Sequence, residues 1–93
     1  MKPECIIDSD GTKEWYLNGK LHREDGPAIE RPDGDKEWWL NHKLHREDGP
    51  AIERANGFKG WWLNYKLYSR EDYWKKQFED GKIDEAALIS ELL

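Results

Sequence analysis

Residues 36–52 read KEWWLNHKLHREDGPAI, and a near copy of this string stands on each side of them. Upstream, residues 13–29 read KEWYLNGKLHREDGPAI, and downstream, residues 59–72 read KGWWLNYKLYSRED. The copies are spaced by 23 positions, as the step from Trp15 to Trp38 shows. Self-similarity at a fixed period of this length is the signature of a repeat architecture. The repeat therefore decides the fold before any single motif does.

The composition indicates one small domain that is rich in aromatic residues. The chain has 93 residues, of which 37% are apolar and 38% are charged, and it contains six Trp, four Tyr and two Phe. Disordered segments are poor in large aromatic residues, so this is a folded composition. The net charge is −5, and acidic and basic residues are interleaved. We therefore expect a single domain over residues 1–93, with no direct binding to nucleic acid or membranes, both of which attract a basic face.

Cysteine usage and the terminal sequence bear on the compartment. Cys5 is the one cysteine, so the chain has no disulfide framework. Cys5 occupies the position that Ala28 and Ala51 fill in the other copies, which predicts a small buried side chain. The start, MKPECIID, has no apolar run typical of a signal peptide, and no later stretch could span a bilayer. We expect a cytoplasmic protein.

Each copy is expected to form three short antiparallel strands, which in the second copy are residues 28–31, 36–40 and 43–46. A turn containing Asp33 and Gly34 joins the first two strands. A two-residue loop would place like charges opposite one another across the hairpin. A three-residue loop over 32–34 instead pairs opposite charges, and it gives glycine the left-handed position that such loops require. We predict this three-residue loop, with Arg31 facing Asp35 and Glu30 facing Lys36.

The second turn of each copy is expected to be a two-residue hairpin loop. In the first copy it is Asn18-Gly19, the strongest short hairpin signal. His42 and Tyr65 replace the glycine in the later copies, although this position requires a positive φ. Each replacement is expected to store about 1 kcal/mol of strain.

Strand side chains alternate between the two faces of a sheet, so each face receives one aromatic row. The first row is Trp15, Trp38 and Trp61, with Leu17, Leu40 and Leu63 beside it. The second row is Tyr16, Trp39 and Trp62, with Leu21, Leu44 and Leu67 beside it. A single sheet cannot cover both of its own faces. We therefore expect the C-terminal segment to cover part of this apolar surface.

Residues 69–93 read as a helical segment. Ser69 is suited to cap a first helix, on which Trp74 and Phe78 would share one face. Gly81 is placed to end this helix, and Asp84 to cap a second one. The expected fold class is mainly β (α+β): an antiparallel β-hairpin repeat sheet of three 23-residue repeats over residues 5–68, with a C-terminal helical cap.

The strings LNGKLHREDGPAI and LNHKLHREDGPAI resemble the MORN-like β-repeat proteins of bacteriophages and prophages. The resemblance covers residues 5–79. It departs from the standard MORN pattern of a shorter glycine-rich unit, so lipid binding is not carried over. The resemblance implies a β-hairpin array, a phage or prophage origin, and no known catalytic residues.

The tetrapeptide His-Arg-Glu-Asp at residues 22–25 and 45–48 is the one constellation that suggests chemistry. A histidine beside two carboxylates can bind a divalent cation or act as acid and base. However, an enzyme site is normally built once, whereas this group recurs with the turn. Tyr68 replaces the histidine in the third copy.

A structural role is therefore expected for His22 and His45, with no cofactor, no metal and no enzymatic activity. In this reading, Asp48 accepts backbone N–H groups, Arg46 pairs across the strand with Glu37, and the histidine ring packs on Trp38. The same roles fall to the corresponding residues of the first copy. A histidine-based metal site remains the alternative.

The sequence points to binding of another protein rather than catalysis. Residues 69–93 carry seven acidic and four basic residues, which suits a partner with a basic, nucleic-acid-binding surface. The concrete hypothesis is a phage or prophage accessory protein that inhibits a bacterial host or defence factor, for example as an anti-CRISPR protein. The alternatives are a self-assembling protein, for example a homodimer, and nucleobase stacking on the aromatic rows. The candidate contact residues are Tyr16, Trp39, Trp62, Glu71, Asp72, Trp74, Glu79 and Asp80.

Overall fold

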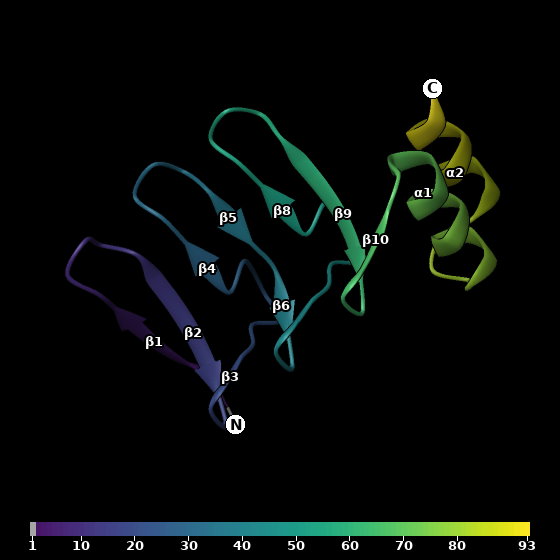
Figure 1. Ribbon diagram of the computed structural model, residues 1–93. Coiled ribbons are helices and arrows are strands. Elements are labelled where there is room, and N and C mark those ends of the chain that lie inside the picture. Colours follow the sequence, from purple (N-terminus) through teal and green to yellow (C-terminus); the bar gives the residue numbers. More distant parts are fainter. Residues whose placement is uncertain (1) are drawn as a thin grey trace.

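The computed structural model describes residues 2–93 and shows a mostly antiparallel β-sheet that is followed by two helices (Figure 1). This confirms a β-rich α+β chain with helices at its C-terminal end. The helices are α1 (Arg70–Glu79) and α2 (Glu85–Leu92). The strands are β1 (Glu4–Ile7), β2 (Lys13–Leu17), β3 (Lys20–Leu21), β4 (Ile29–Glu30), β5 (Lys36–Glu37), β6 (Trp39–Leu40), β7 (Lys43–Leu44), β8 (Ile52–Glu53), β9 (Lys59–Leu63) and β10 (Lys66–Tyr68).

The strands follow one another along the sheet in almost the order of the chain. Strands β1, β2, β4, β5, β8, β9 and β10 are neighbours in that order, and β3 pairs with β2. Strands β6 and β7 form a separate two-stranded sheet. Figure 1 shows the hairpins β1–β2, β4–β5 and β8–β9 side by side, with the two helices beyond β10. Neither helix, within residues 2–93, has the length and apolar character that a membrane crossing requires.

The predicted three-residue loop between β4 and β5 is confirmed. Glu30 lies opposite Lys36, and the backbone N–H of Arg31 donates to the carbonyl oxygen of Asp35 at 2.9 Å. Gly34 has a φ of 101°, a conformation that glycine adopts without the steric cost of a side chain. The register that charge pairing predicted for this hairpin is therefore the one that the structure shows.

The predicted two-residue turns are also confirmed. Trp39 lies opposite Leu44 and Leu40 opposite Lys43, which leaves a two-residue loop between the strands. The non-glycine residues of this loop and of its downstream counterpart have positive φ, including 65° at His42 and 66° at Tyr65. These values place the backbone of both residues in the left-handed region, which is strained for residues other than glycine, as the sequence indicated.

The predicted strand over residues 36–40 is divided into β5 and β6. In the first copy, pairing continues to Glu4 opposite Tyr16, so β2 stays whole. In the second copy, Pro27 occupies the position of Glu4 and has no N–H to donate. Pairing between β4 and β5 therefore ends at Glu37, and β7 reaches only to Leu44, opposite Trp39, so Trp38 is paired in neither ladder. In the third copy Tyr68 lies opposite Trp61, and β9 stays whole.

The apolar interior consists of small clusters between neighbouring hairpins. One cluster is formed by Leu44, Ala51 and Ile52, with tryptophan rings packed against it. Ala28 and Ala51 are completely buried, but Cys5 at the corresponding position is exposed. The expectation of a buried cysteine is wrong, because Cys5 lies on β1, the edge strand of the sheet in residues 2–93.

The helix caps are as expected, but the buried face of α1 is not. The Ser69 side chain accepts a hydrogen bond from the backbone N–H of Asp72 at 3.1 Å. Trp74 is 6% exposed, whereas Phe78, expected to share one face with it, is 39% exposed. Tyr73 and Gln77 are buried in its place, because they bond to the loop that carries the second His-Arg-Glu-Asp group.

Candidate functional site

Tyr16, Trp39 and Trp62 lie on one face of the strands and are half-buried. Each has a leucine opposite it on the neighbouring strand, since Trp39 faces Leu44 and Trp62 faces Leu67. These leucines support the rings from one side. The other side of the row is the first candidate surface for contact with a partner.

Two turn residues extend the row at its edge. The Tyr65 ring centroid lies 6.4 Å from that of Trp39 and 5.8 Å from that of Trp62, so it stands between the two indoles. The His42 ring lies 5.9 Å from the Trp39 ring. Tyr65 is 60% exposed. We name Trp39, His42, Trp62 and Tyr65 together the aromatic face.

A buried carboxylate holds Trp39 in place. The Trp39 Nε1–H donates to Glu37 Oε1 at 3.0 Å. The other oxygen of Glu37 accepts from Arg31 at 3.3 Å and from Arg54 at 3.2 Å. Because two cations compensate its charge, Glu37 is tolerated at 7% exposure. The aromatic face is therefore attached to a fixed polar network, and its central indole is held in one orientation.

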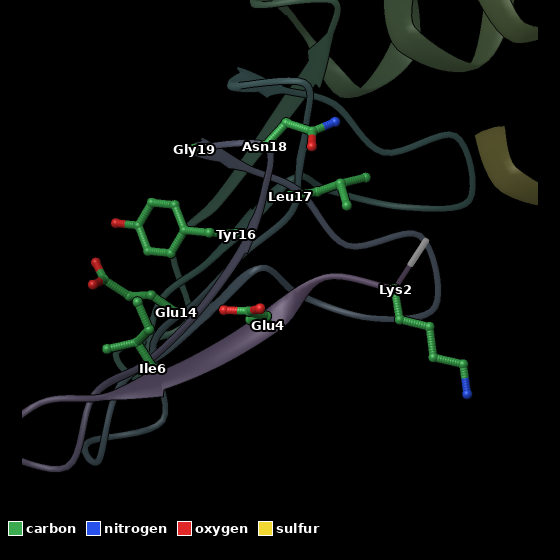
Figure 2. Close-up of a pocket in the computed structure, with 8 residues that line it drawn as sticks. All are labelled: Lys2, Glu4, Ile6, Glu14, Tyr16, Leu17, Asn18 and Gly19. Carbon is green, nitrogen blue, oxygen red and sulfur yellow. The ribbon is translucent and has the colours of Figure 1, made fainter.

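Tyr16 lies at the N-terminal end of the same row and lines a hollow of about 610 Å³ (Figure 2). Ile6 and Glu14 contribute to the wall of this hollow. Burial, together with the neighbouring Glu14 carboxylate, raises the pKa of Tyr16. Tyr16 thus belongs to the open end of the row rather than to the aromatic face.

The other aromatic row is covered by arginine side chains. The Arg23 guanidinium lies 4.0 Å from the Trp15 ring centroid, and the Arg46 guanidinium lies 3.8 Å from that of Trp38. The expectation that histidine rings pack on these tryptophans is wrong, because the planar guanidinium occupies the position. The third member, Trp61, packs against Tyr73 and Trp74 of α1.

The arginines also have different ionic partners from those expected. Arg46 donates to Asp48 at 2.9 Å and to Glu53 at 3.1 Å, and not across the strand to Glu37. It also donates to the carbonyl oxygen of Pro50 at 3.0 Å. The Asp48 carboxylate therefore accepts a hydrogen bond from the guanidinium, whereas the sequence predicted that it would accept a backbone N–H. In the first copy, the same contacts join Arg23 to Asp25, Glu30 and the carbonyl oxygen of Pro27.

The histidines link adjacent copies of the sequence. His45 Nδ1 accepts the backbone N–H of Asn64 at 2.9 Å, and His22 Nδ1 accepts that of Asn41 at 3.0 Å. On its other side, the His45 ring lies 2.9 Å from Glu47, and this hydrogen bond holds the pKa of that carboxyl below its ordinary value. In residues 2–93, no group of three or more histidine, cysteine or acidic side chains is placed to hold a metal ion.

The candidate residues of α1 differ among themselves. Trp74 is only 6% exposed and belongs to a cluster with Leu63 and Tyr73, so we leave it out of the contact surface. Glu71 pairs with Lys75 at 2.9 Å, and Asp80 pairs with Lys76 at 3.2 Å. Asp72 and Glu79 are exposed. Figure 1 places α1 beyond β10, away from the β6–β7 hairpin that carries Trp39.

Sequence reasoning found three members of the aromatic row but did not include His42 and Tyr65 among the contact residues. The available signal was an aromatic or imidazole ring at a turn position where Asn18-Gly19 has glycine. No family model, curated protein or solved structure matches this chain.

Proposed function

We propose that this chain is a non-enzymatic protein-binding module that contacts its partner through the aromatic face. The observation that carries the proposal is the position of Tyr65. Its ring is 60% exposed, although its backbone has a φ of 66°. A bulky residue in this conformation costs about 1 kcal/mol relative to glycine, and strained positions of this kind cluster at functional sites.

The chain itself offers a comparison for this position. Gly19 has the same place in the first copy, with a φ of 76° and without steric cost. His42, the other replacement, has an internal role, because its Nδ1 accepts the backbone N–H of Leu21 at 3.3 Å. Tyr65 instead presents its ring to solvent beside Trp39 and Trp62, which is the arrangement expected of a contact residue.

The chemistry of the aromatic face suits a protein partner. Tyrosine and tryptophan are enriched at the centres of protein interfaces, and they provide a large contact area with few rotatable bonds. Single-strand binders combine stacked aromatic rings with a basic groove. Here the carboxylate of Glu37 lies against Trp39, and the net charge of the chain is −5. A protein is therefore the better match for this surface than a nucleic acid strand.

The proposed partner is a bacterial protein with a basic, nucleic-acid-binding surface. The acidic balance of the whole chain supports this choice, as do the exposed carboxylates of Asp72 and Glu79. Opposite charge speeds encounter with such a surface and competes with its nucleic acid ligand. Together with the resemblance to phage-type repeats, this favours a phage accessory protein that inhibits a host or defence factor in the bacterial cytoplasm.

We also propose that the three sequence copies act as one repeat array. Hydrogen bonds that recur 23 positions apart support this. The bond from Trp15 N–H to the Ala28 carbonyl oxygen has its counterpart between Trp38 and Ala51. In such an array each unit contacts mainly its neighbours, so the exposed edge of the stack becomes the binding surface.

Affinity capture from bacterial lysate tests the proposal, with wild type, Tyr65→Gly and Phe58→Ser as baits. Tyr65→Gly restores the residue that the first copy has at this turn, so the fold is expected to be retained. Phe58 is 57% exposed at a different turn and is a matched control. A partner that is recovered by wild type and Phe58→Ser but reduced at least fivefold by Tyr65→Gly supports the proposal. Equal recovery by all three baits, or no partner above background, rejects it.

Self-assembly is the second candidate function, because the exposed apolar side chains of β1 could instead be covered by another copy of the chain. Ile6 and Ile7 are 52% and 62% exposed on this edge strand. Sedimentation of the purified chain separates the two functions. A monomer at 100 µM, about a hundredfold above a typical micromolar affinity, favours a foreign partner, whereas a closed dimer favours assembly.

A further inference from the structure

The N-terminal end of the sheet leaves exposed the positions that the later copies bury. Ile29 is 5% exposed and Ile52 is 9% exposed, whereas Ile6 at the corresponding position is 52% exposed. Ile52 lies in one apolar cluster with Leu44 of the preceding copy. Within residues 2–93 no corresponding segment covers Ile6.

The covering segment has a defined structure in the chain. Leu44 is 6% exposed and belongs to a cluster with Ile52, against which the Trp62 ring packs. This leucine begins the tripeptide Leu44-His45-Arg46, which makes three hydrogen bonds to the next copy. The Leu44 carbonyl oxygen accepts Tyr65 N–H at 2.8 Å, His45 Nδ1 accepts Asn64 N–H at 2.9 Å, and Arg46 N–H donates to the Trp62 carbonyl oxygen at 3.2 Å.

The same interface occurs once more, 23 positions earlier. The Leu21 carbonyl oxygen accepts His42 N–H at 2.8 Å. The two following residues complete the set, because His22 Nδ1 accepts Asn41 N–H at 3.0 Å and Arg23 N–H donates to the Trp39 carbonyl oxygen at 3.1 Å. The Leu-His-Arg tripeptide is thus bound at two places in the chain, each time by equivalent groups of the next copy.

The residues that would receive such a tripeptide in the first copy lie together around one hollow. By the 23-residue spacing they are Ile6, Tyr16, Asn18 and Gly19, and all four line the hollow of about 610 Å³ (Figure 2). Figure 2 shows Ile6 and Tyr16 on one side of this hollow and the Asn18-Gly19 turn at its upper end. The hollow therefore has the isoleucine and the turn residues that receive Leu44 and His45 in the third copy, whereas the third position of the tripeptide is taken by the pairing of Glu4 with Tyr16.

We infer that this hollow binds an extended segment of a partner protein, with the local sequence leucine followed by histidine or another acceptor residue. The leucine side chain packs on Ile6 and Tyr16, and its carbonyl oxygen accepts the N–H of Gly19. The second side chain accepts the N–H of Asn18. The third contact of the later copies is not available here, because Tyr16 is paired with Glu4 of β1. This inference rests on the proposed protein-binding function and adds a second contact to it.

Charge selects the flanking residues of the segment. The carboxylates of Glu4 and Glu14 line the hollow, against the single ammonium group of Lys2. In the second copy, the position of Glu14 is taken by Glu37, which two arginines neutralise. In the first copy, Asp8 occupies the position that Arg31 has in the second copy, so the charge of Glu14 is less completely neutralised than that of Glu37. A neutral or basic segment is therefore preferred to an acidic one.

A second copy of this chain is a poorer occupant than a foreign segment. The two Leu-His-Arg tripeptides of the chain are already bound internally, as the 8% exposure of Leu21 shows. The third equivalent is Leu67-Tyr68-Ser69, which has no histidine acceptor, and α1 packs beside it on Trp61. A two-fold pairing of N-terminal ends would bring the carboxylates of two hollows together, which is unfavourable.

The direct test is a titration of the full chain, ¹⁵N-labelled, with an acetylated and amidated peptide of the sequence GKLHR. The backbone amide signals of Asn18 and Gly19 are expected to shift and approach saturation at millimolar peptide. The peptide GKAHR is expected to bind at least fivefold more weakly, because it loses the leucine contact. Removal of about 1 kcal/mol of apolar burial corresponds to a change of this size.

Two matched variants of β1 locate the contact. Ile6→Ser removes an exposed side chain that lines the hollow, and a loss of affinity of at least fivefold is expected. Ile7→Ser removes an equally exposed side chain from the other face of the strand, and a change of less than twofold is expected. Sedimentation and the amide spectrum of each variant confirm that it is folded and monomeric.

Three results overturn the inference. They are the absence of shifts at Asn18 and Gly19, equal loss of affinity in both variants, and dimerisation through β1 without peptide. The last assigns the edge to a second copy. Tyr65→Gly separates this test from the test of the proposed function, because that variant is expected to bind the peptide normally while losing the captured partner. Failure of the capture experiment alone rejects the aromatic face and leaves the hollow supported.

Discussion

His45 Nδ1 accepts the backbone N–H of Asn64 at 2.9 Å, so an imidazole of the second copy closes the turn of the third. His22 does the same for Asn41 one copy earlier. Each histidine therefore uses its Nδ1 as an acceptor, and its side chain is about 10% exposed. The motif that most resembled a reactive site is a structural link between hairpins.

Replacement of His45 by alanine is expected to lower the free energy of unfolding by about 1–2 kcal/mol, because the Asn64 N–H loses its partner and the ring contacts are lost. His45→Asn is expected to recover about half of this loss, since its side-chain oxygen can reach the position of Nδ1. Urea unfolding, followed by tryptophan fluorescence, measures both variants. Equal stability of alanine and asparagine would show that the hydrogen bond contributes nothing.

Arg46 stabilises the fold through its planar guanidinium rather than through charge alone. Arg46→Lys keeps the charge but loses the stacking on Trp38 and most of the hydrogen bonds to Asp48, Pro50 and Glu53. We expect a loss of about 1–2 kcal/mol in the free energy of unfolding. Lys43→Ala, at an exposed position, serves as the control and is expected to change stability by less than about 0.5 kcal/mol. A lysine variant as stable as wild type would contradict this account.

Glu37 and Glu14 occupy the same position in successive copies and allow a matched comparison. Glu37→Gln leaves the guanidinium groups of Arg31 and Arg54 without their shared carboxylate in a buried site. We expect a loss of about 2–3 kcal/mol in the free energy of unfolding. Glu14→Gln is expected to cost less than about 1 kcal/mol, because Asp8 replaces the first of these arginines. Chemical denaturation of both variants checks the difference, and similar losses would refute it.

Alkaline pH is expected to weaken the fold through Tyr73. Burial raises the pKa of Tyr73 from its ordinary 10.0 to about 12. Its hydroxyl donates to the carbonyl oxygen of Arg46 and accepts the N–H of Gly49 at 3.3 Å. Because the folded pKa is raised, this stabilisation is complete below pH 10 and is lost as the pH rises through 12. The loss is expected to be about 2 kcal/mol.

The Tyr73→Phe variant isolates this contribution. It is expected to be less stable than wild type by about 1–2 kcal/mol at pH 8, because both hydrogen bonds of the hydroxyl are absent. Between pH 10 and 12 the gap should close, since only wild type carries the buried phenol. Tyr65→Phe, at an exposed ring, should instead track wild type throughout. A gap that stays constant with pH would show that Tyr73 does not titrate with a raised pKa.

Local chemistry was sufficient to predict the turns and the helix caps. The loop over residues 32–34 followed from charge pairing, and the positive φ of His42 and Tyr65 followed from the glycine in the first copy. Both features are set within a single short hairpin, where few backbone arrangements compete. The same holds for the cap of α1 at Ser69.

Contacts between copies were not predictable in the same way. Whether arginine or histidine lies on Trp38 depends on how far the loop of residues 45–50 folds back, and a repeated sequence gives no sign of this. Cys5 and Ile6 are exposed on the edge strand β1, although Ala28 and Ile29 at the corresponding positions are buried, so the similarity of the sequences was misleading. The buried face of α1 is set by Tyr73 and its bond to the Arg46 carbonyl oxygen, a contact over 27 positions.

Side-chain footprinting of the captured complex by hydroxyl radicals tests the central claim most directly. In the free chain, Tyr65 should be oxidised readily because it is 60% exposed, with Phe58 as an equally exposed reference at 57%. On partner binding, the account predicts at least a fivefold drop in the oxidation rate of Tyr65, a smaller drop at Trp39 and Trp62, and no change at Phe58. Unchanged oxidation of Tyr65 in a complex that forms would contradict it.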